Sequence, residues 1–313
     1  MSCKIAYSWY LFTKQIHYEY QKRTWKPTGV SHLDEALQRM DNHMALANNA
    51  WATRQNYLRG VRCLMLHFNK RPEDCTVDEL KAYLVHTRDV QQLSSSSVNL
   101  RVCGLKYYFR EVAHRLDLVV SIPNPRHQKY FTEILNTQEV LRLFGACRDM
   151  RQLLALQLIY ETGMRVREVV RLRTADFDKQ LRTITIHNSK GRKTRTVPYG
   201  EALRHTLRQY CKARGSVPPN TLLESVKEPG QPLSQRGVQY IVRDAVKRSG
   251  ISKRIHPHTL RHTFAVHYLN FGGTLPQLQQ LLGHEYITTT LHYLKYAHIP
   301  GRDALSVLDT LKQ

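Results

Sequence analysis

Apolar side chains recur every three or four positions through the first part of the chain, which predicts amphipathic helices between residues 29 and 121. An early stripe comprises Val61, Leu64, Met65 and Phe68. The clearest stripe comprises Val98, Val102, Leu105, Phe109, Val112 and Leu116. We interpret both stripes as the core of a small helical bundle. The serine run at 94–97 fits a loop that ends in the N-cap of the following helix.

A segment with little apolar periodicity separates this bundle from the rest of the chain. Residues 122–134 contain two prolines and several basic side chains. Because proline cannot easily continue a helix, we interpret this segment as an extended basic linker. The predicted organisation is therefore an N-terminal extension at 1–28, a helical domain at 29–121, the linker, and a second domain at 135–313.

The second domain combines two periodicities. Thr137 is placed to cap its first helix, and an apolar helix at 153–160 is expected to end near Gly163. Between residues 181 and 197, apolar and polar side chains alternate on both sides of a turn-like stretch. This alternation predicts two strands joined by a turn, with Lys190 at the tip of the hairpin.

Helices resume after a loop rich in proline and glycine. They are expected at 234–249, 257–271, 276–282 and around Tyr293. The predicted fold class is mainly α, in which an N-terminal helical bundle precedes a mixed α/β domain of helices and a small antiparallel sheet.

Charge and cysteine usage narrow the possible partners. The chain has 47 Lys and Arg against 25 Asp and Glu, a net charge of +22, which favours a polyanion and above all nucleic acid. Its six cysteines contain no C-x-x-C pair, so their spacing predicts neither a zinc site nor a disulfide framework, and suggests a reducing cytoplasm. The sequence indicates neither a signal peptide nor a membrane-spanning run.

Four separated segments carry candidate chemistry. They read T-G-M-R-V-R-E at 162–168, S-K-G-R-K at 189–193, H-T-L-R-H at 258–262 and L-G-H at 282–284, and Tyr293 follows His284 by nine residues. Each segment alone is weak evidence, because a single arginine is usually a solvated charge and a single histidine usually a satisfied polar group.

In this order and spacing, the four segments resemble the tyrosine recombinase, or phage integrase, family. The resemblance covers residues 135–313 and, more loosely, the helical bundle. It implies an enzyme that needs no metal or other cofactor and that breaks and rejoins DNA through a covalent 3'-phosphotyrosine intermediate and a Holliday junction. The resemblance also implies that Tyr293 is the nucleophile.

The resemblance assigns further roles along the four segments. Arg165 and Arg261 would neutralise the negative charge that develops on the scissile phosphate, and His284 would hydrogen-bond it. Lys190 would protonate the leaving 5'-hydroxyl. His258, which shares a helix face with Arg261, would accept a proton near the nucleophile.

Three neighbouring side chains receive secondary roles or remain open. Glu168 is expected to orient an arginine or histidine. His262 must point away from the face of its helix that carries His258, so we expect mainly a structural role. Tyr296 remains an alternative nucleophile, because it would share a helix face with Tyr293, and Lys193 is the alternative to Lys190.

The expected partner is double-stranded DNA with a specific recombination site. We expect its phosphates to contact Arg192, Lys193, Arg195, Arg54 and Arg59. The last residues carry an apolar stripe of Ala304, Leu305, Leu308 and Leu311. In the resembled family such a tail links subunits, which implies a dimer on each site and a homotetramer on DNA. No membrane partner is expected. The resemblance further implies a mobile-element protein at the nucleoid, in the cytoplasm of a prokaryotic host.

Three other readings compete with this one. A type IB topoisomerase-like enzyme would share the phosphotyrosine chemistry without assembling on specific sites. A catalytically idle DNA-binding protein would not need all the reactive residue types. A metal-dependent nuclease would use a cluster of five histidines, namely His256, His258, His262, His267 and His284. Arg261, interleaved among them, disfavours a bound cation.

Overall fold

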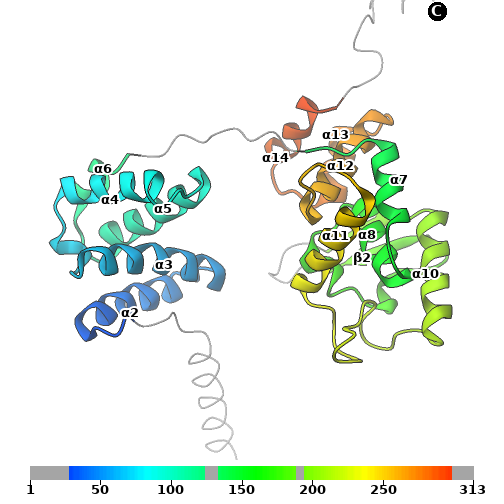
Figure 1. Ribbon diagram of the computed structural model, residues 1–313, viewed down its shortest axis with the longest axis horizontal. Helices are drawn as coiled ribbons and strands as arrows, with labels where there is room; N and C mark the ends of the chain where they lie inside the picture. Colours follow the sequence, from blue (N-terminus) through cyan, green and yellow to red (C-terminus); the bar gives the residue numbers. More distant parts are fainter. Residues whose placement is uncertain (1–27, 124–132, 188–193, 298–313) are drawn as a thin grey trace, which may run out of the picture. The chain divides into compact units, whose positions relative to one another are not determined.

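The computed structural model describes residues 28–123, 133–187 and 194–297, and it divides the chain into two compact units at residues 1–130 and 131–313. The described residues are mainly helical, and the second unit adds a three-stranded antiparallel sheet (Figure 1). The predicted mainly α fold class is therefore confirmed. Most of the linker predicted at 122–134 and the hairpin tip with Lys190 lie outside the described residues.

The N-terminal unit is a bundle of helices around one hydrophobic core. Its elements are α2 (Ser31–Leu46), α3 (Trp51–Phe68), the 3-10 turn η1 (Pro72–Asp74), α4 (Val77–Asp89), α5 (Ser95–Glu111) and α6 (Leu116–Ser121). Ser94 caps α5, because its side chain accepts a hydrogen bond from the backbone N–H of Ser97. The serine run therefore holds an N-cap, as predicted.

The apolar stripe of α5 is buried along most of its length. Its first four members lie in the core, and Val112 packs against them. The prediction is wrong for Leu116, which is 61% exposed. The reason is that α5 ends at Glu111 and the backbone turns at His114, whose φ is +52°, so the helical period does not continue to Leu116.

One ion pair is buried within the N-terminal unit. The Arg54 guanidinium on α3 lies 2.6 Å from the carboxylate of Asp41 on α2, and the two side chains are 14% and 2% exposed. Arg54 thus packs inward rather than decorating the outer face of its helix, whereas Arg59 on the same helix is exposed. This contact links α2 to α3.

The C-terminal unit combines helices with the small sheet. Its elements are α7 (Thr137–Gly145), α8 (Met150–Thr162), α9 (Val166–Val169), η2 (Thr174–Asp176), β1 (Phe177–Asp178), β2 (Thr183–Ile186), β3 (Arg195–Pro198), α10 (Glu201–Arg214), α11 (Gln235–Ser249), α12 (Pro257–Asn270), α13 (Leu275–Leu282), α14 (Ile287–Leu291) and η3 (His292–Lys295). In the sheet, β2 pairs with both neighbours, and Ile184 faces Phe177 on one side and Val197 on the other.

Several local expectations change in this unit. Asn136, not Thr137, caps α7, because its side chain accepts from the backbone of Glu139 and the Glu139 carboxylate accepts from Asn136. The periodicity analysis did not predict β1 or α10. Residues 201–214 carry so many charged side chains that only a narrow apolar face, formed by Leu203, Thr206 and Tyr210, is buried.

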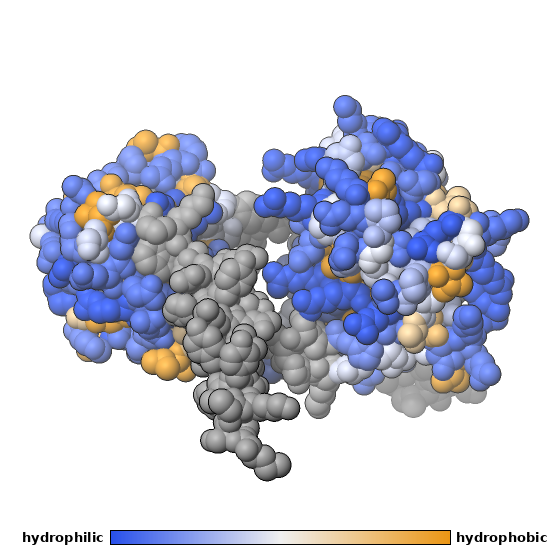
Figure 2. Space-filling view, turned by 90° about the horizontal axis from the view of Figure 1, so that it is seen from below, coloured by the Kyte–Doolittle hydropathy of each residue, from blue (hydrophilic) through white to orange (hydrophobic). Residues whose placement is uncertain are grey.

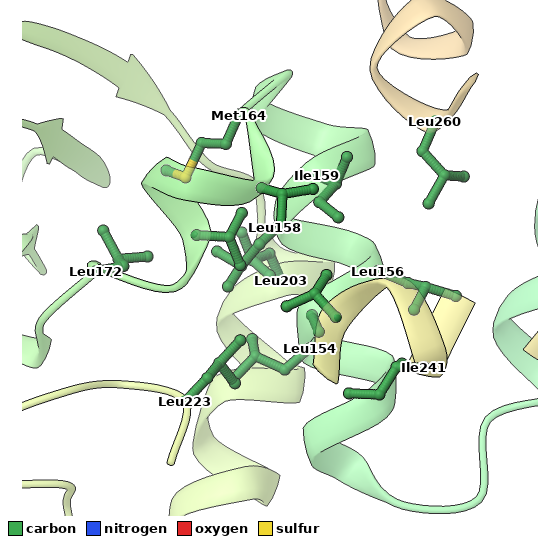
Figure 3. Close-up of a cluster of buried hydrophobic side chains, with 14 of the residues drawn as sticks. Leu154, Leu156, Leu158, Ile159, Met164, Leu172, Leu203, Leu223, Ile241 and Leu260 are labelled. Atoms are coloured by element: carbon green, nitrogen blue, oxygen red, sulfur yellow. The ribbon is translucent and has the colours of Figure 1, made fainter. Parts of the chain in front are cut away.

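Helix α8 is the central helix of the C-terminal unit. Its Leu154, Leu156, Leu158 and Ile159 lie among apolar side chains from the surrounding segments (Figure 3). On the face seen in Figure 2, hydrophilic side chains dominate the described surface, with scattered apolar spots. Because α8 is apolar on most of its faces, it is fixed in the core, and its C-terminal end at Thr162 becomes a rigid starting point for the segment that carries Arg165.

Candidate active site

Gly163 shapes the turn that leads from α8 to Arg165. Its φ is +63°, a conformation that side chains other than glycine rarely adopt. A Cβ atom at this position would also lie 2.7 Å from side-chain atoms of Leu282 and Phe264. The glycine of the first motif is thus required both by the backbone conformation and by the close approach of α12 and α13.

Arg165 stands immediately before α9, and its side chain is 37% exposed. Its Nη1 lies 3.1 Å from Oε1 of Glu168, and its backbone N–H donates to Oε2 of the same carboxylate at 2.8 Å. Glu168 thereby holds both the main chain and the side chain of Arg165. This agrees with the expectation that Glu168 orients an arginine.

The other partner of Glu168 is Arg195 on β3. Burial alone would raise the pKa of Glu168, but hydrogen bonds and charges from Arg195 and Arg165 outweigh burial and lower this pKa to about 2. The side chain of Arg195 is only 8% exposed. Arg195 is therefore part of the protein interior, and the expected outward contact with a DNA phosphate does not fit this position.

Arg261 on α12 lies at the C-terminal ends of two helices. Its Nη1 donates to the carbonyl of Gly163 after α8, and its Nη2 donates to the carbonyl of Leu282 in α13 at 2.8 Å. Carbonyls at helix C-termini lack partners within the helix and carry partial negative charge, which suits a cation. Burial and the charge of Arg165 lower the pKa of Arg261 to about 10, so Arg261 stays charged at neutral pH.

His284 follows the turn after α13, and both of its ring nitrogens have partners. Nε2 lies 3.1 Å from Nη2 of Arg261, and Nδ1 lies 3.0 Å from the hydroxyl of Thr290. Because arginine can only donate, Nε2 must be the unprotonated acceptor, which leaves the proton on Nδ1. Burial and the nearby arginines lower the pKa of His284 to about 4, consistent with a neutral ring.

Tyr293 lies in η3 and is only 4% exposed. Its hydroxyl oxygen is 3.0 Å from Nδ1 of His262, and its ring stacks on the His284 ring at a centroid distance of 6.3 Å. Burial raises the pKa of Tyr293, and the charges of Arg261 and Arg165 partly offset this effect. The phenol is therefore protonated at neutral pH, and it needs a proton acceptor before it can attack.

The expected role of His262 is wrong in one respect, because this side chain points toward Tyr293 rather than away from the site. Burial, followed by the charges of neighbouring groups, lowers the pKa of His262 to about 4, so the ring is neutral at neutral pH. His258 lies on the exposed side of α12. Partial desolvation and the charges of His256, Arg261 and Arg165 lower its pKa. Both faces of α12 thus contribute histidines to the site.

Tyr296 shares part of the surroundings of Tyr293. Its ring meets His292 at a centroid distance of 5.4 Å and packs against the apolar cluster beneath η3. Tyr293 lies in the same cluster, and its ring also meets His292, at a centroid distance of 6.2 Å, so the two tyrosines differ in their hydroxyl contacts rather than in their packing. The hydroxyl next to His262 belongs to Tyr293.

Several predicted site residues cannot be placed. Lys190, Arg192 and Lys193 lie outside the described residues, as does the apolar stripe predicted at 304–311. Within the described ranges, no group of three or more His, Cys, Asp or Glu side chains is arranged to hold a metal ion. Four histidines of the alternative metal cluster have hydrogen-bond partners outside the cluster, for example the Tyr160 hydroxyl for His267 at 2.8 Å. No helix in the described part of the chain is long and apolar enough to cross a membrane.

The site therefore gathers fixed positive charge and neutral imidazoles around a buried phenol. Arg165 and Arg261 lie close enough for each to perturb the electrostatics of Tyr293. Such a set can bind a phosphate, neutralise negative charge that develops on it and take up the proton of a tyrosine nucleophile. Sequence reasoning missed His262 and Arg195 as members of this site.

Comparisons with known proteins agree with this chemistry. The model of the "Phage integrase family" matches residues 133–298, and that of the "Phage integrase, N-terminal SAM-like domain" matches residues 36–116. Tyrosine recombinase XerC of Bacillus licheniformis is 32% identical over 239 residues, which cover 71% of this chain and 77% of the relative. Tyrosine recombinase XerC of Staphylococcus aureus is 32% identical over 227 residues, which cover 69% and 74%.

A solved structure shares the fold. It is a lambda integrase tetramer bound to a Holliday junction, and it matches with a TM-score of 0.70 and 22% sequence identity. The match covers 87% of this chain and 80% of the integrase chain.

Proposed function

The chain belongs to the phage integrase family and is a site-specific tyrosine recombinase that breaks and rejoins DNA, and from this premise we propose that Tyr293 is its nucleophile. The observation that carries the proposal is the hydrogen bond between the Tyr293 hydroxyl and Nδ1 of His262, beside the buried Arg261. The Tyr293 oxygen attacks the scissile phosphorus and forms a 3'-phosphotyrosine while the 5'-oxygen leaves.

His262 accepts the proton of Tyr293 in the proposed mechanism. Its Nδ1 is already within hydrogen-bond reach of the hydroxyl, and the neutral ring has a free electron pair there when Nε2 carries the proton. This changes the role expected for His258. We propose that His258, on the exposed side of α12, contacts the phosphate that lies over the site.

Arg165 and Arg261 stabilise the transition state. Two guanidinium groups supply permanently charged donors to the equatorial oxygens of the pentacoordinate phosphorus. His284 joins them only after a change of partner, because its Nε2 accepts from Arg261 in this structure. An anionic phosphate next to His284 raises its pKa, and the protonated ring can then donate a hydrogen bond to the phosphate.

The leaving 5'-oxygen needs a proton, and we assign this step to Lys190. The assignment rests on the position of Lys190 in the K-G-R-K motif, five residues before the buried Arg195 on β3. Lys193, Arg192 and Arg59 are assigned to the DNA backbone, whereas Arg54 and Arg195 are assigned to interior contacts because their side chains are buried.

The assembly we propose is a homotetramer, with two subunits on each DNA site. It is supported by the shared fold with the lambda integrase tetramer on a Holliday junction. The element served is a mobile genetic element or a chromosomal site in a prokaryotic cytoplasm, in keeping with the bacterial XerC relatives. A type IB topoisomerase-like activity is not favoured, because the relatives reported above are named tyrosine recombinases.

The test begins with a duplex library that contains a nick and randomised flanking positions. The nick traps a covalent intermediate, because the short fragment that carries the new 5'-hydroxyl diffuses away before it can be religated. Wild-type protein is incubated with the library, adducts are isolated on a denaturing gel, and the enriched sequence serves as substrate for the variants. We expect Tyr293→Phe to form no adduct and Tyr296→Phe, as the matched control, to form it.

The opposite pattern would assign the nucleophile to Tyr296. An adduct with both single variants would refute a tyrosine at either position. Relaxation of a supercoiled plasmid that lacks the selected sequence, at the same rate as a plasmid that contains it, would support the topoisomerase reading instead.

A further inference from the structure

Arg195 makes three polar contacts in the interior of the C-terminal unit. Its Nη1 lies 2.9 Å from Oε1 of Glu168, and its Nη2 lies 2.7 Å from Oε2, so the pair is bidentate. Its Nε donates to the carbonyl of Leu281 at 2.8 Å. One side chain thus connects β3 with α9 and with the last turn of α13.

Glu168 stands between two guanidinium groups. Arg195 occupies both of its oxygens, whereas the Arg165 side chain reaches only Oε1, at 3.1 Å. Arg195 is buried, but Arg165 is 37% exposed. The buried Arg195 thus neutralises most of the carboxylate charge, and the more exposed Arg165 is not closed into a bidentate pair with Glu168.

Without Arg195, the electrostatics of this group would change. A buried carboxylate without a partner is strongly unfavourable, so Glu168 would take the nearest cation. That cation is Arg165, whose fork-shaped guanidinium can pair with both oxygens of the carboxylate. A closed Arg165–Glu168 pair would have no net charge to offer a phosphate.

We propose that Arg195 is a positioning residue that occupies Glu168 and thereby leaves the Arg165 guanidinium free to bind the scissile phosphate. This inference rests on the proposed function of Arg165. Arg195 does not touch the DNA, and it acts through Glu168.

Arg195 also has a structural contact with the end of α13, which the tests must separate from its effect on Arg165. Gly283 has a φ of +63°, and a Cβ atom there would lie 3.0 Å from Cδ of Arg195. The glycine of the L-G-H motif therefore makes room for Arg195 directly before His284. Through this contact Arg195 also fixes the turn that carries His284.

If Arg195 acts through its charge, a double variant at Arg195 and Glu168 should behave differently than if Arg195 only supports the fold. Arg195→Met keeps the length of the side chain but removes its charge, and we expect the rate of adduct formation to fall by about a hundredfold, the effect of one lost electrostatic contribution at an active site. Adding Glu168→Gln removes the carboxylate that would capture Arg165. The double variant should therefore recover about tenfold relative to Arg195→Met, because the two positions are directly coupled.

The second readout uses a substrate whose scissile phosphate is replaced by a neutral methylphosphonate. The methylphosphonate carries no negative charge before the reaction, so the rate of its cleavage depends less on Arg165. The ratio of the wild-type rate to the Arg195→Met rate should therefore be smaller on the methylphosphonate than on the phosphate. A side chain that only holds the fold together would give the same ratio on both substrates.

Arg195→Lys serves as the second variant if Arg195→Met does not fold, as judged by circular dichroism. Lysine keeps one positive charge next to Glu168 but cannot make all three contacts. If the charge of Arg195 matters, Arg195→Lys should retain most of the rate of adduct formation. If Arg195 only holds the turn at Gly283 in place, Arg195→Lys should lose as much of this rate as Arg195→Met.

Two results together would overturn the inference: an equal loss of rate for Arg195→Met on the phosphate and on the methylphosphonate, and no recovery when Glu168→Gln is added to Arg195→Met. Adduct formation by Tyr293→Phe would instead refute the proposed function. Normal Arg195 variants combined with an inactive Tyr293→Phe would refute only the role of Arg195.

Discussion

Nδ1 of His262 lies 3.0 Å from the hydroxyl oxygen of Tyr293, although 30 residues separate the two in the chain. The contact joins α12 to η3 and pairs a neutral imidazole with a phenol whose pKa is raised. A phenol in this state attacks a phosphate only if its proton is removed. We propose that His262, rather than His258, takes up this proton.

The first prediction concerns this proton transfer. His262→Phe keeps a ring in the site but removes the acceptor nitrogen, and we expect adduct formation on the selected nicked duplex to slow by about 10²–10⁴-fold, the usual range for general base catalysis. The matched control is His256→Asn on the same helix, because asparagine preserves the N-cap of α12. Equal rates for His262→Phe and wild type would exclude His262 as the acceptor.

The second prediction compares three glycines that end helices with similar backbone angles. Gly163, Gly250 and Gly283 have φ of +63°, +66° and +63°. A Cβ atom added at Gly250 would meet nothing within 4 Å. At Gly283 the added Cβ would lie 3.0 Å from Cδ of Arg195, and at Gly163 it would lie 2.7 Å from side-chain atoms of Leu282 and Phe264.

The Gly250→Ala variant should therefore report backbone strain alone, about 1–2 kcal/mol of unfolding free energy. Gly283→Ala should cost more, and Gly163→Ala most, because the neighbouring side chains must also move. Urea unfolding of the full chain measures all three. A larger loss for Gly250→Ala than for Gly163→Ala would contradict the close approach of α12 and α13 to Gly163.

The third prediction separates two arginines of α3. Arg54 is in a buried pair with Asp41, and breaking such a pair costs about 3–5 kcal/mol because one charge stays buried without a partner. We expect Asp41→Ala to destabilise the N-terminal unit by this order. Asp89→Ala, which breaks the exposed pair with Arg88, should cost far less, because solvent screens that pair.

Arg59→Ala should behave in the opposite way. Its side chain is exposed, so the free energy of unfolding should hardly change. The loss of one phosphate contact should reduce the steepness of log binding constant against log salt concentration by about one. Titration of the selected duplex at several salt concentrations measures this slope. An unchanged slope for Arg59→Ala would remove Arg59 from the DNA-contacting surface.

The sequence predicts the residue types of the site better than their contacts. The period of apolar residues identified α8 and its end at Gly163, because a buried helix and its glycine cap leave a local pattern. The partnership of His262 with Tyr293 depends on how α12 packs against η3, and no local pattern records that. Arg195 looked like a DNA contact because a basic hairpin resembles a solvated surface, whereas its burial follows from Glu168, which lies 27 residues earlier.

The fold shows the same division between local and tertiary information. Helices with a broad apolar face were predicted, but α10 was not, because its buried face is narrow among many charges. The stripe of α5 was extended too far, to Leu116, because periodicity alone does not show the left-handed turn at His114. Tertiary packing decides these points.

The last prediction concerns acid stability. His262 and His284 each have a pKa of about 4 in the folded chain, against an ordinary value near 6.5, because burial disfavours their charged forms. The unfolded chain therefore binds protons first as the pH falls from about 6.5 toward 4, and the unfolding free energy of the C-terminal unit must decrease over this window.

Glu168 has a pKa of about 2 in the folded chain against an ordinary value of 4.5, so its contribution is lost at still lower pH, between about 4.5 and 2. Urea unfolding between pH 8 and pH 4.5 isolates the histidines from this carboxylate. His284→Gln should flatten the pH dependence, because glutamine cannot take up a proton. If the stability of the wild type stayed constant from pH 7 to pH 5, burial would not be lowering the pKa values of the two site histidines.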